Sequence, residues 1–172
     1  MSKSWKEHSQ SKIIPPEALK NHVESLRKKG KTIATLNGSF DLMHAGHLHI
    51  IYEASKAADV LIVALNTDRS IQEYKSPLRP IISLEYRLQM MSALGFVSYV
   101  TWFDETDPKR ILSVIKPDVH VNGAEYGQNC IEAETVKMNG GKVHIVELVP
   151  GLSTSEILKK INTIQNTDNK RI

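Results

Sequence analysis

One stretch of the chain decides its fold: Asn37-Gly38-Ser39-Phe40-Asp41-Leu42-Met43-His44-Ala45-Gly46-His47. An apolar run at residues 33–36 precedes it and predicts a β-strand, and a helical pattern follows from about residue 45 to 58. A strand, a turn that contains glycine and a helix N-terminus favour a bound anion, because free N–H groups and the helix dipole meet there. His44 and His47 lie on one side of the first helical turn. Two cationic or hydrogen-bond-donating rings directed at one point suit an anionic transition state.

The histidines have two other interpretations. Most histidine pairs on helices lie on the surface or are satisfied within the core. A metal cluster of His44, His47 and His49 is the second alternative, but His49 points about 200° around the helix from His47. No cysteine or carboxylate cluster completes such a site. The flanking Gly38-x-Phe40-Asp41 favours a functional role, and no protein metal site is predicted.

Strands and helices alternate along the chain. Their order predicts a Rossmann-like, doubly wound α/β fold, with a parallel sheet of about five strands and helices on both faces. A ligand of such a sheet binds beyond the carboxyl ends of the strands, at the switch point. The turn at 37–47 and the loop at 151–155 both belong at that edge. The predicted strands are at about residues 31–36, 60–65, 99–103, 119–121 and 143–148.

Composition and charge are those of a globular domain. The chain has 172 residues, with 41% hydrophobic and 24% charged, which fits a single core. A net charge of +3 without a long Lys/Arg run gives no indication of nucleic-acid binding. The only cysteine, Cys130, excludes an internal disulfide and favours a reducing compartment. No apolar stretch of membrane length and no signal peptide is present, so a cytoplasmic protein without a membrane partner is expected.

The block Gly38-x-Phe40-Asp41, followed by His44-x-Gly46-His47, resembles the signature of the cytidylyltransferase-like nucleotidyltransferase superfamily. Its members are α/β enzymes that transfer a nucleoside monophosphate to a phosphorylated acceptor and release pyrophosphate. A second element lies far downstream, where residues 151–157 resemble the C-terminal "ISTT"-type motif of the family. Two motifs in the order that the family requires argue against coincidence.

Other segments resemble the heptose 1-phosphate adenylyltransferase branch, which is the C-terminal half of bifunctional ADP-heptose synthases and in some organisms a separate enzyme. The resemblance implies ATP as co-substrate and a sugar 1-phosphate as acceptor, D-glycero-D-manno-heptose 1-phosphate, in lipopolysaccharide biosynthesis. It also implies a separate sugar kinase upstream in the pathway. The segments are Arg79-Pro80, Leu84-Glu85-Tyr86-Arg87, Lys116-Pro117-Asp118, Val121-Asn122-Gly123-Ala124-Glu125-Tyr126, Gly140-Gly141 and residues 153–161.

The resemblance assigns roles to residues of this chain. The catalytic residues would be His44 and His47, which steady the α-phosphate, and Lys75, which holds the β- and γ-phosphates. Mg²⁺ would bridge the phosphates, held by substrate oxygens and water. Arg87 would face a nucleotide or acceptor phosphate, and Asp41 would also order the turn. The predicted nucleotide- and phosphate-binding residues are Asn37, Gly38, Ser39, Phe40, Asp41, Gly46, Arg87, Asn122, Gly123, Tyr126, Ser153, Thr154 and Ser155.

Two positions depart from related patterns and leave alternatives open. Heptose enzymes commonly have lysine where this chain has Asn122. Glycerol-phosphate cytidylyltransferases have an arginine shortly before the C-terminal motif, where this chain has Val149-Pro150. One alternative is a cytidylyltransferase that acts on glycerol 3-phosphate or another phosphorylated acceptor. The other is a nucleotide-binding protein without turnover.

Three segments are predicted: an N-terminal helical extension at 1–30, the nucleotidyltransferase domain at 31–164 and a polar tail at 165–172. The resemblance further implies a homodimer. Its contact could use the apolar stretch Phe96, Val97, Tyr99 and Trp102, although these residues could equally belong to the core.

Overall fold

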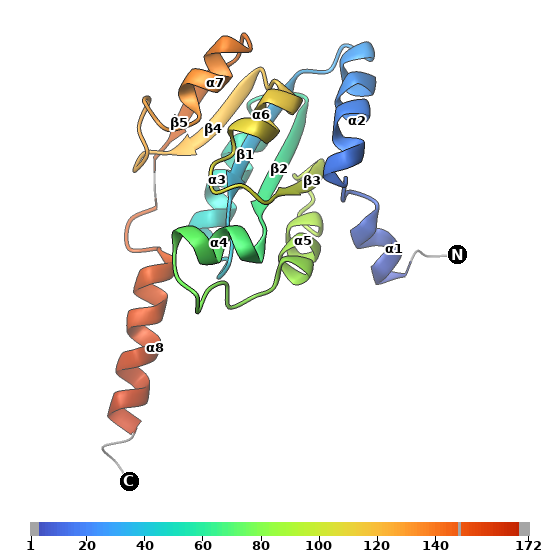
Figure 1. Cartoon of the computed structure of the whole chain (residues 1–172). Coiled ribbons are helices and arrows are strands. Elements are labelled where there is room, and N and C mark those ends of the chain that lie inside the picture. Colours follow the sequence, from blue (N-terminus) through green and yellow to red (C-terminus); the bar gives the residue numbers. More distant parts are fainter. Residues whose placement is uncertain (1–3, 148, 169–172) are drawn as a thin grey trace.

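Five parallel strands form one sheet in the order β3-β2-β1-β4-β5 (Figure 1). The structure is a computed structural model that describes residues 4–147 and 149–168. The strand order and direction confirm the predicted doubly wound sheet. The strands are β1 (Ile33–Gly38), β2 (Val60–Asn66), β3 (Tyr99–Phe103), β4 (Val119–Gly123) and β5 (Lys142–Val146).

Helices cover both faces of the sheet, as predicted. Apolar side chains of α3 and α5, such as Ile51 and Met91, pack on one face. Those of α2 and α6, such as Leu19, Val23 and Ile115, pack on the other. The helices are α1 (Trp5–Gln10), α2 (Pro16–Lys28), α3 (Ala45–Ser55), α4 (Asp68–Tyr74), α5 (Leu84–Ser92), α6 (Lys109–Ile115), α7 (Ala133–Met138) and α8 (Thr154–Asp168).

Element boundaries differ from the prediction in places that matter for the site. β1 runs from Ile33 to Gly38, so Asn37 is still part of the strand. The segment predicted as an N-terminal extension contributes α2, whose residues Leu19, Val23 and Leu26 are buried against the sheet. α8 projects away from the sheet (Figure 1) and continues to Asp168, so the first residues of the predicted tail are helical. Residues 1–3, 148 and 169–172 lie outside the described part.

The pairing of β1 with β4 is short compared with the other ladders. β1 pairs with β2 along its whole length, from Ile33↔Val60 to Gly38↔Leu65. With β4 it pairs at Ala34↔Val119 and Thr35↔His120. The two strands therefore separate before their carboxyl ends. Because the strand order reverses between β1 and β4, this gap is the switch point where a ligand is expected.

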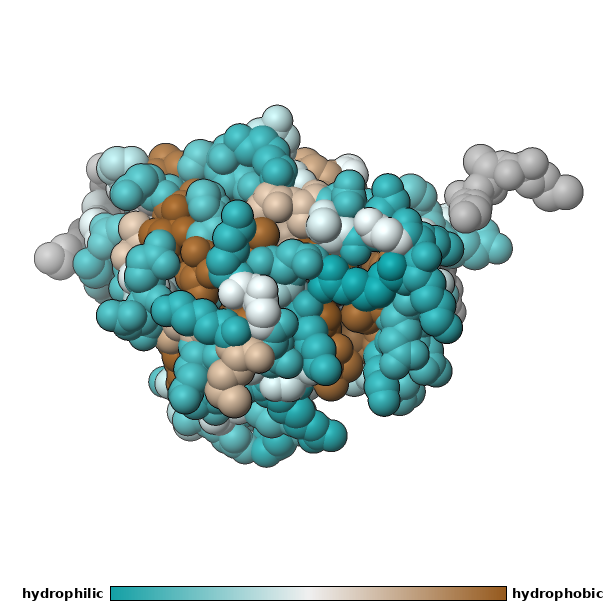
Figure 2. Space-filling view, turned by 90° about the horizontal axis from the view of Figure 1, so that it is seen from above, coloured by the Kyte–Doolittle hydropathy of each residue, from teal (hydrophilic) through white to brown (hydrophobic). Residues whose placement is uncertain are grey.

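Surface features bear on the remaining predictions. Among the described residues, no helix combines the length and apolar character that crossing a membrane requires. Seen from above, at the end opposite α8, the surface is mainly hydrophilic with small hydrophobic areas (Figure 2).

Within the stretch expected to form a dimer contact, Val97 is in the core, whereas Phe96, Tyr99 and Trp102 are half-buried against it. The homodimer stays a prediction.

His120 is a fully buried histidine in the centre of the sheet. Its Nδ1 lies 2.9 Å from Thr35 Oγ1 on β1, and its Nε2 has no partner. Burial lowers the pKa of His120 to about 4, even though the nearby Glu132 carboxylate acts in the opposite direction. The imidazole is therefore neutral in the folded protein at neutral pH.

This burial predicts acid sensitivity of the fold. The unfolded chain takes up a proton on His120 near pH 6.5, whereas the folded protein does so only near pH 4, so stability is full above pH 6.5 and falls as the pH drops toward 4. We expect His120→Gln to reduce this loss by up to about 1.4 kcal/mol per pH unit in that window. Urea unfolding from pH 7.5 to 4.5 measures both slopes. Equal slopes for wild type and variant would contradict the assignment.

Candidate active site

A cavity of about 260 Å³ opens at the carboxyl end of the sheet, over the gap between β1 and β4. It brings together most of the predicted site residues, from segments far apart in the sequence. They are Asn37, Gly38, Ser39, Phe40, His44, Gly46, His47, Lys75, Asn122, Gly123, Tyr126, Ser153 and Thr154. A cavity of about 500 Å³ between α2, α6 and the end of β3 contains none of the predicted residues.

The two histidines are fixed by backbone donors at the start of α3. Gly46 N donates to His44 Nδ1 at 3.1 Å, and His44 N donates to His47 Nδ1 at 3.4 Å. The rings stack with centroids 3.9 Å apart. Because a backbone N–H can only donate, these two contacts favour neutral rings that accept at Nδ1 and carry their proton on Nε2. The His47 ring also forms a hydrogen bond with the Leu42 backbone.

The charge state of the histidines follows from their surroundings. Burial lowers the pKa of His44, and burial together with His44 and Lys75 lowers the pKa of His47 to about 4. At neutral pH the rings of the unliganded protein are therefore uncharged. From the sequence, the two imidazole rings could be either cations or neutral hydrogen-bond donors. The structure favours neutral rings.

Small and strained residues allow this arrangement. A Cβ on Gly46 would lie 3.0 Å from the His44 ring, so a larger residue would push the imidazole out of place. Phe40 has a φ of 44°, in the left-handed region that non-glycine residues rarely adopt. Its ring packs edge-on against His47 at a centroid distance of 5.4 Å. The turn therefore stores backbone strain that packing against His47 helps to offset.

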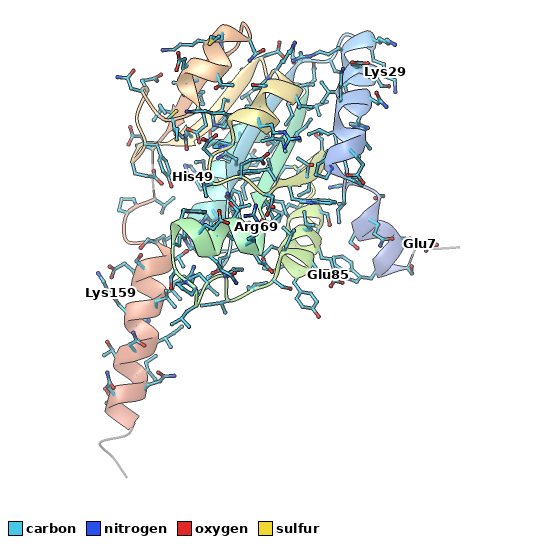
Figure 3. The ribbon with its side chains drawn as sticks, viewed as in Figure 1. Glu7, Lys29, His49, Arg69, Glu85 and Lys159 are labelled. Atoms are coloured by element: carbon cyan, nitrogen blue, oxygen red, sulfur yellow. The ribbon has the colours of Figure 1, made fainter. Side chains whose placement is uncertain are left out.

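Cationic and helix-end groups line the same cavity as the histidines. Lys75, at the end of α4, places its Nζ 3.0 Å from Ser39 Oγ. Burial and the nearby Arg79 lower its pKa. Ser153 precedes α8, and its Oγ accepts from Glu156 N at 3.2 Å, as an N-cap serine does. The Glu156 carboxylate pairs with Lys159, which lies farther along α8 (Figure 3).

Three predicted residues do not line the cavity: Asp41, Arg87 and Ser155. Asp41 is buried and accepts from Ile81 N and Ile82 N, both at 2.9 Å, and it pairs with Arg79. It thereby fastens the histidine turn to the loop before α5. The ordering role expected for Asp41 agrees with these contacts.

Arg87 differs from its expected role. Its side chain was expected to face a phosphate, but it is 1% exposed, behind the cavity wall. The guanidinium donates to Ser39 O at 2.7 Å, to two further carbonyls and to Asp68 Oδ1 at 2.6 Å. Because α5 packs beneath the turn, the arginine is enclosed before it reaches the cavity. It holds the backbone of Ser39 in place.

Sequence reasoning missed several residues that line the cavity. Tyr74 and Glu125 are sequence neighbours of predicted residues, and that proximity was the available signal. The apolar members had no chemical signal, since their positions depend on how the elements pack. The missed residues are Leu36, Ile50, Tyr74, Glu125, Val149 and Leu152.

The described residues contain no group of three or more histidine, cysteine, aspartate or glutamate side chains that could hold a metal ion. Histidine, lysine and serine side chains form the end of the cavity near α8. A hard cation such as Mg²⁺ prefers carboxylate and phosphate oxygens. This donor set therefore fits an anion, and it fits Mg²⁺ only as an ion that a phosphorylated ligand brings with it.

The fold and the site together define a Rossmann-like domain with a histidine-bearing turn at its switch point. Residues 35–166 match the cytidylyltransferase-like family model, and the chain belongs to that family.

Individual relatives agree with this membership. The chain is 41% identical over 154 residues to "Bifunctional protein HldE" of Paramagnetospirillum magneticum, and 38% identical over 152 residues to the protein of that name from Syntrophotalea carbinolica. These alignments cover 89% and 88% of this chain but only 32% and 31% of the relatives, so the chain spans about a third of their length.

A solved structure has a similar fold. It is the lipopolysaccharide core biosynthesis protein from Thermoplasma volcanium, with a TM-score of 0.57 and 29% identity, covering 70% of this chain and 98% of that one. Pantoate-beta-alanine ligase from Francisella tularensis has a TM-score of 0.57 at 15% identity, covering 84% and 74%, and shows likeness of fold alone.

The enclosed guanidinium predicts a large effect on stability. In Arg87→Lys, one ammonium cannot serve all four acceptors, so buried carbonyls lose their donors and unfolding should become easier by about 3 kcal/mol. Arg69→Lys is a matched control, because Arg69 is an exposed arginine on α4 (Figure 3) and should change stability by less than about 1 kcal/mol. Urea unfolding compares the two. Similar stabilities for both variants would show that Arg87 is not the fastening group.

Proposed function

We propose that this protein transfers AMP from ATP to D-glycero-D-manno-heptose 1-phosphate, forming ADP-heptose and pyrophosphate. The observation that carries the proposal is the convergence of the stacked His44 and His47, Lys75 and the start of α8 on one cavity at the switch point. The relatives support the choice of substrate class. Their names refer to a bifunctional HldE protein and to lipopolysaccharide core biosynthesis, and the sequence resembles the adenylyltransferase half of ADP-heptose synthases.

The chemistry requires positioning and charge stabilisation more than covalent participation by the protein. An oxygen of the acceptor phosphate attacks the α-phosphorus of ATP in line. The bond to the β-phosphate breaks, and pyrophosphate leaves with the electron pair. His44 and His47 donate to α-phosphate oxygens, where negative charge builds, and this charge raises the proton affinity of the rings. Lys75 and the first N–H groups of α8 hold the β- and γ-phosphates.

Mg²⁺ enters this scheme as part of the nucleotide substrate. The described residues around the cavity offer no carboxylate cluster to bind it, so the phosphates and water would hold it. When bound, it would neutralise charge on the triphosphate.

One observation weakens the cytidylyltransferase alternative. Val149 lines the cavity in the region where cytidylyltransferases that act on glycerol 3-phosphate have an arginine. An apolar side chain there removes a donor for the nucleotide or its phosphates. The intact, stacked pair of His44 and His47 argues against the second alternative, a binding protein without turnover.

The proposal also includes the compartment, the oligomeric state and the source of the sugar 1-phosphate. We place the protein in the cytoplasm as a homodimer, and a sugar kinase activity supplies its sugar 1-phosphate.

The function can be tested by a pyrophosphate-release screen of four nucleoside triphosphates against heptose, hexose and glycerol phosphates. We expect ATP with heptose 1-phosphate to have the highest kcat/KM, at least about tenfold above CTP or GTP, because a mismatched base leaves polar groups unpaired. A preference for CTP with glycerol 3-phosphate would select the first alternative. ATP binding without pyrophosphate release from any pair would select the binding protein.

A mutation separates catalysis from folding. His47→Ala should lower kcat by about 10²–10³-fold, the usual cost of one donor directed at a developing charge. Unfolding should become easier by no more than about 2 kcal/mol. ATP affinity should fall less than turnover, since the triphosphate keeps its contacts with Lys75 and α8. Turnover, calorimetric ATP affinity and melting temperature are measured on the same protein.

His49→Ala is the matched control. His49 lies on the same helix (Figure 3), is exposed and does not line the cavity. Its variant should retain full activity. Near-wild-type turnover of His47→Ala, or a collapse of its fold with normal activity in the folded fraction, would end the catalytic assignment.

A further inference from the structure

The gap between the carboxyl ends of β1 and β4 is bridged by side chains in place of backbone pairing. The β1–β4 ladder stops at Thr35↔His120, whereas the β4–β5 ladder continues to Gly123↔Val146. Beyond Thr35 and His120 lie Asn37 on β1 and Asn122 on β4, and both line the cavity. The separation of these strand ends therefore depends on what connects the two asparagines.

Glu132, just before α7, makes that connection. Asn37 Nδ2 donates to Glu132 Oε1 at 3.2 Å, and Asn122 Nδ2 donates to Glu132 Oε2 at 3.3 Å. Gly123 N donates to Asn122 Oδ1 at 3.2 Å. An ionised carboxylate only accepts, so both amides must turn their nitrogens toward it, and their orientation is fixed. Each carboxylate oxygen thus holds one strand end.

Glu132 is set behind the cavity wall. It is 5% exposed and does not line the cavity. Its contacts are neutral groups: the two amides and the Cys130 thiol, whose pKa is raised by burial. His120 is close but uncharged at neutral pH, because burial lowers its pKa. A buried carboxylate with neutral partners is costly compared with an apolar side chain. The contribution of Glu132 to the protein must therefore lie in the positions that it imposes on Asn37 and Asn122.

We propose that Glu132 is a positioning residue that sets the spacing between the ends of β1 and β4 and thereby the affinity for the nucleoside part of the nucleotide. The inference rests on the proposed function. The groups assigned to the triphosphate, His44, Lys75 and Ser153, come from α3, α4 and the start of α8, outside this bridge. A change in the bridge should therefore alter nucleoside binding and spare phosphate binding.

Glu132→Gln tests this separation. The side chain keeps its size, but its NH₂ group can pair only with an amide oxygen. Asn122 Oδ1 already accepts from Gly123 N, so the link is kept only if Asn37 turns over and buries its NH₂ group where the unpartnered Oδ1 now lies, which weakens the hold on one strand end. We expect the calorimetric Kd values of ATP and AMP to rise by about tenfold, as for the loss of one well-placed hydrogen-bond link. The Kd of inorganic tripolyphosphate should change by less than about twofold.

A second substitution should restore the bridge. When Asn122→Asp is combined with Glu132→Gln, the glutamine oxygen accepts from Asn37, and the glutamine NH₂ donates to the carboxylate introduced on β4. The second oxygen of that carboxylate still accepts from Gly123 N. All three hydrogen bonds are kept with the charge moved, so ATP affinity should return to within about threefold of wild type. A merely structural role would not give rescue confined to nucleoside binding.

Several outcomes would overturn the inference. Unchanged ATP affinity in folded Glu132→Gln, an equal loss for ATP and tripolyphosphate, or no recovery in the double variant would each do so. Should Glu132→Gln fail to fold, Glu132→Asp, whose shorter side chain cannot reach both asparagine amides at once, carries the same expectations. If wild type fails to bind ATP, the proposed function fails and this role with it. If wild type binds ATP and the variants match it, only the role of Glu132 fails.

Discussion

Two backbone N–H groups at the start of α3 determine what the site can do. By donating to the Nδ1 atoms of His44 and His47, they orient both rings and favour the tautomer with its proton on Nε2. The same contacts stack the rings, so each disfavours a positive charge on the other. A helix N-terminus supplies such unsatisfied donors in any case, and here they are used to aim side chains. The rest of the structure supports this turn: strand β1 delivers it, and two buried charged residues hold it.

Those two residues, Arg87 and Asp41, fix the backbone around the turn. Arg87 holds the carbonyl of Ser39 from below, and Asp41 ties the turn to the loop that precedes α5. Neither side chain lines the cavity, yet each fixes backbone that does. Hydrogen bonds of buried charged side chains are strong and directional. Losing one partner of such a group destabilises the fold, because it leaves a buried charge uncompensated. Rigid presentation of the histidines is therefore coupled to the stability of the whole domain.

The opposite wall of the cavity is organised differently. At the switch point the sheet gives up backbone pairing between β1 and β4, and this opens the crevice that a ligand needs. Backbone groups near the gap must find other partners or water. Asparagine side chains at the two strand ends, joined through Glu132, give this wall a defined width. The site thus combines a wall built on backbone donors with a wall built on side-chain amides.

The sequence by itself determined the fold class and most of the residues that meet at the cavity. Apolar periodicity indicated the order of strands and helices, and parallel order brings the carboxyl ends of strands to one edge. The turn at 37–47 and the loop at 151–155 were therefore predicted to converge from the order of the elements and the motifs that they carry, and the family resemblance added Lys75.

Tertiary structure alone decided which charged residues face the cavity and which lie behind it. The residues around Arg87 in the sequence do not reveal that α5 packs under the turn and encloses its guanidinium. Glu132 carries no motif, and its role depends on two strands separating above it. Motif spacing and periodicity are local properties of the chain, whereas burial of a charge depends on which distant elements pack around it. The protonation of His44 and His47 follows the same rule, because burial and neighbouring charges set their pKa.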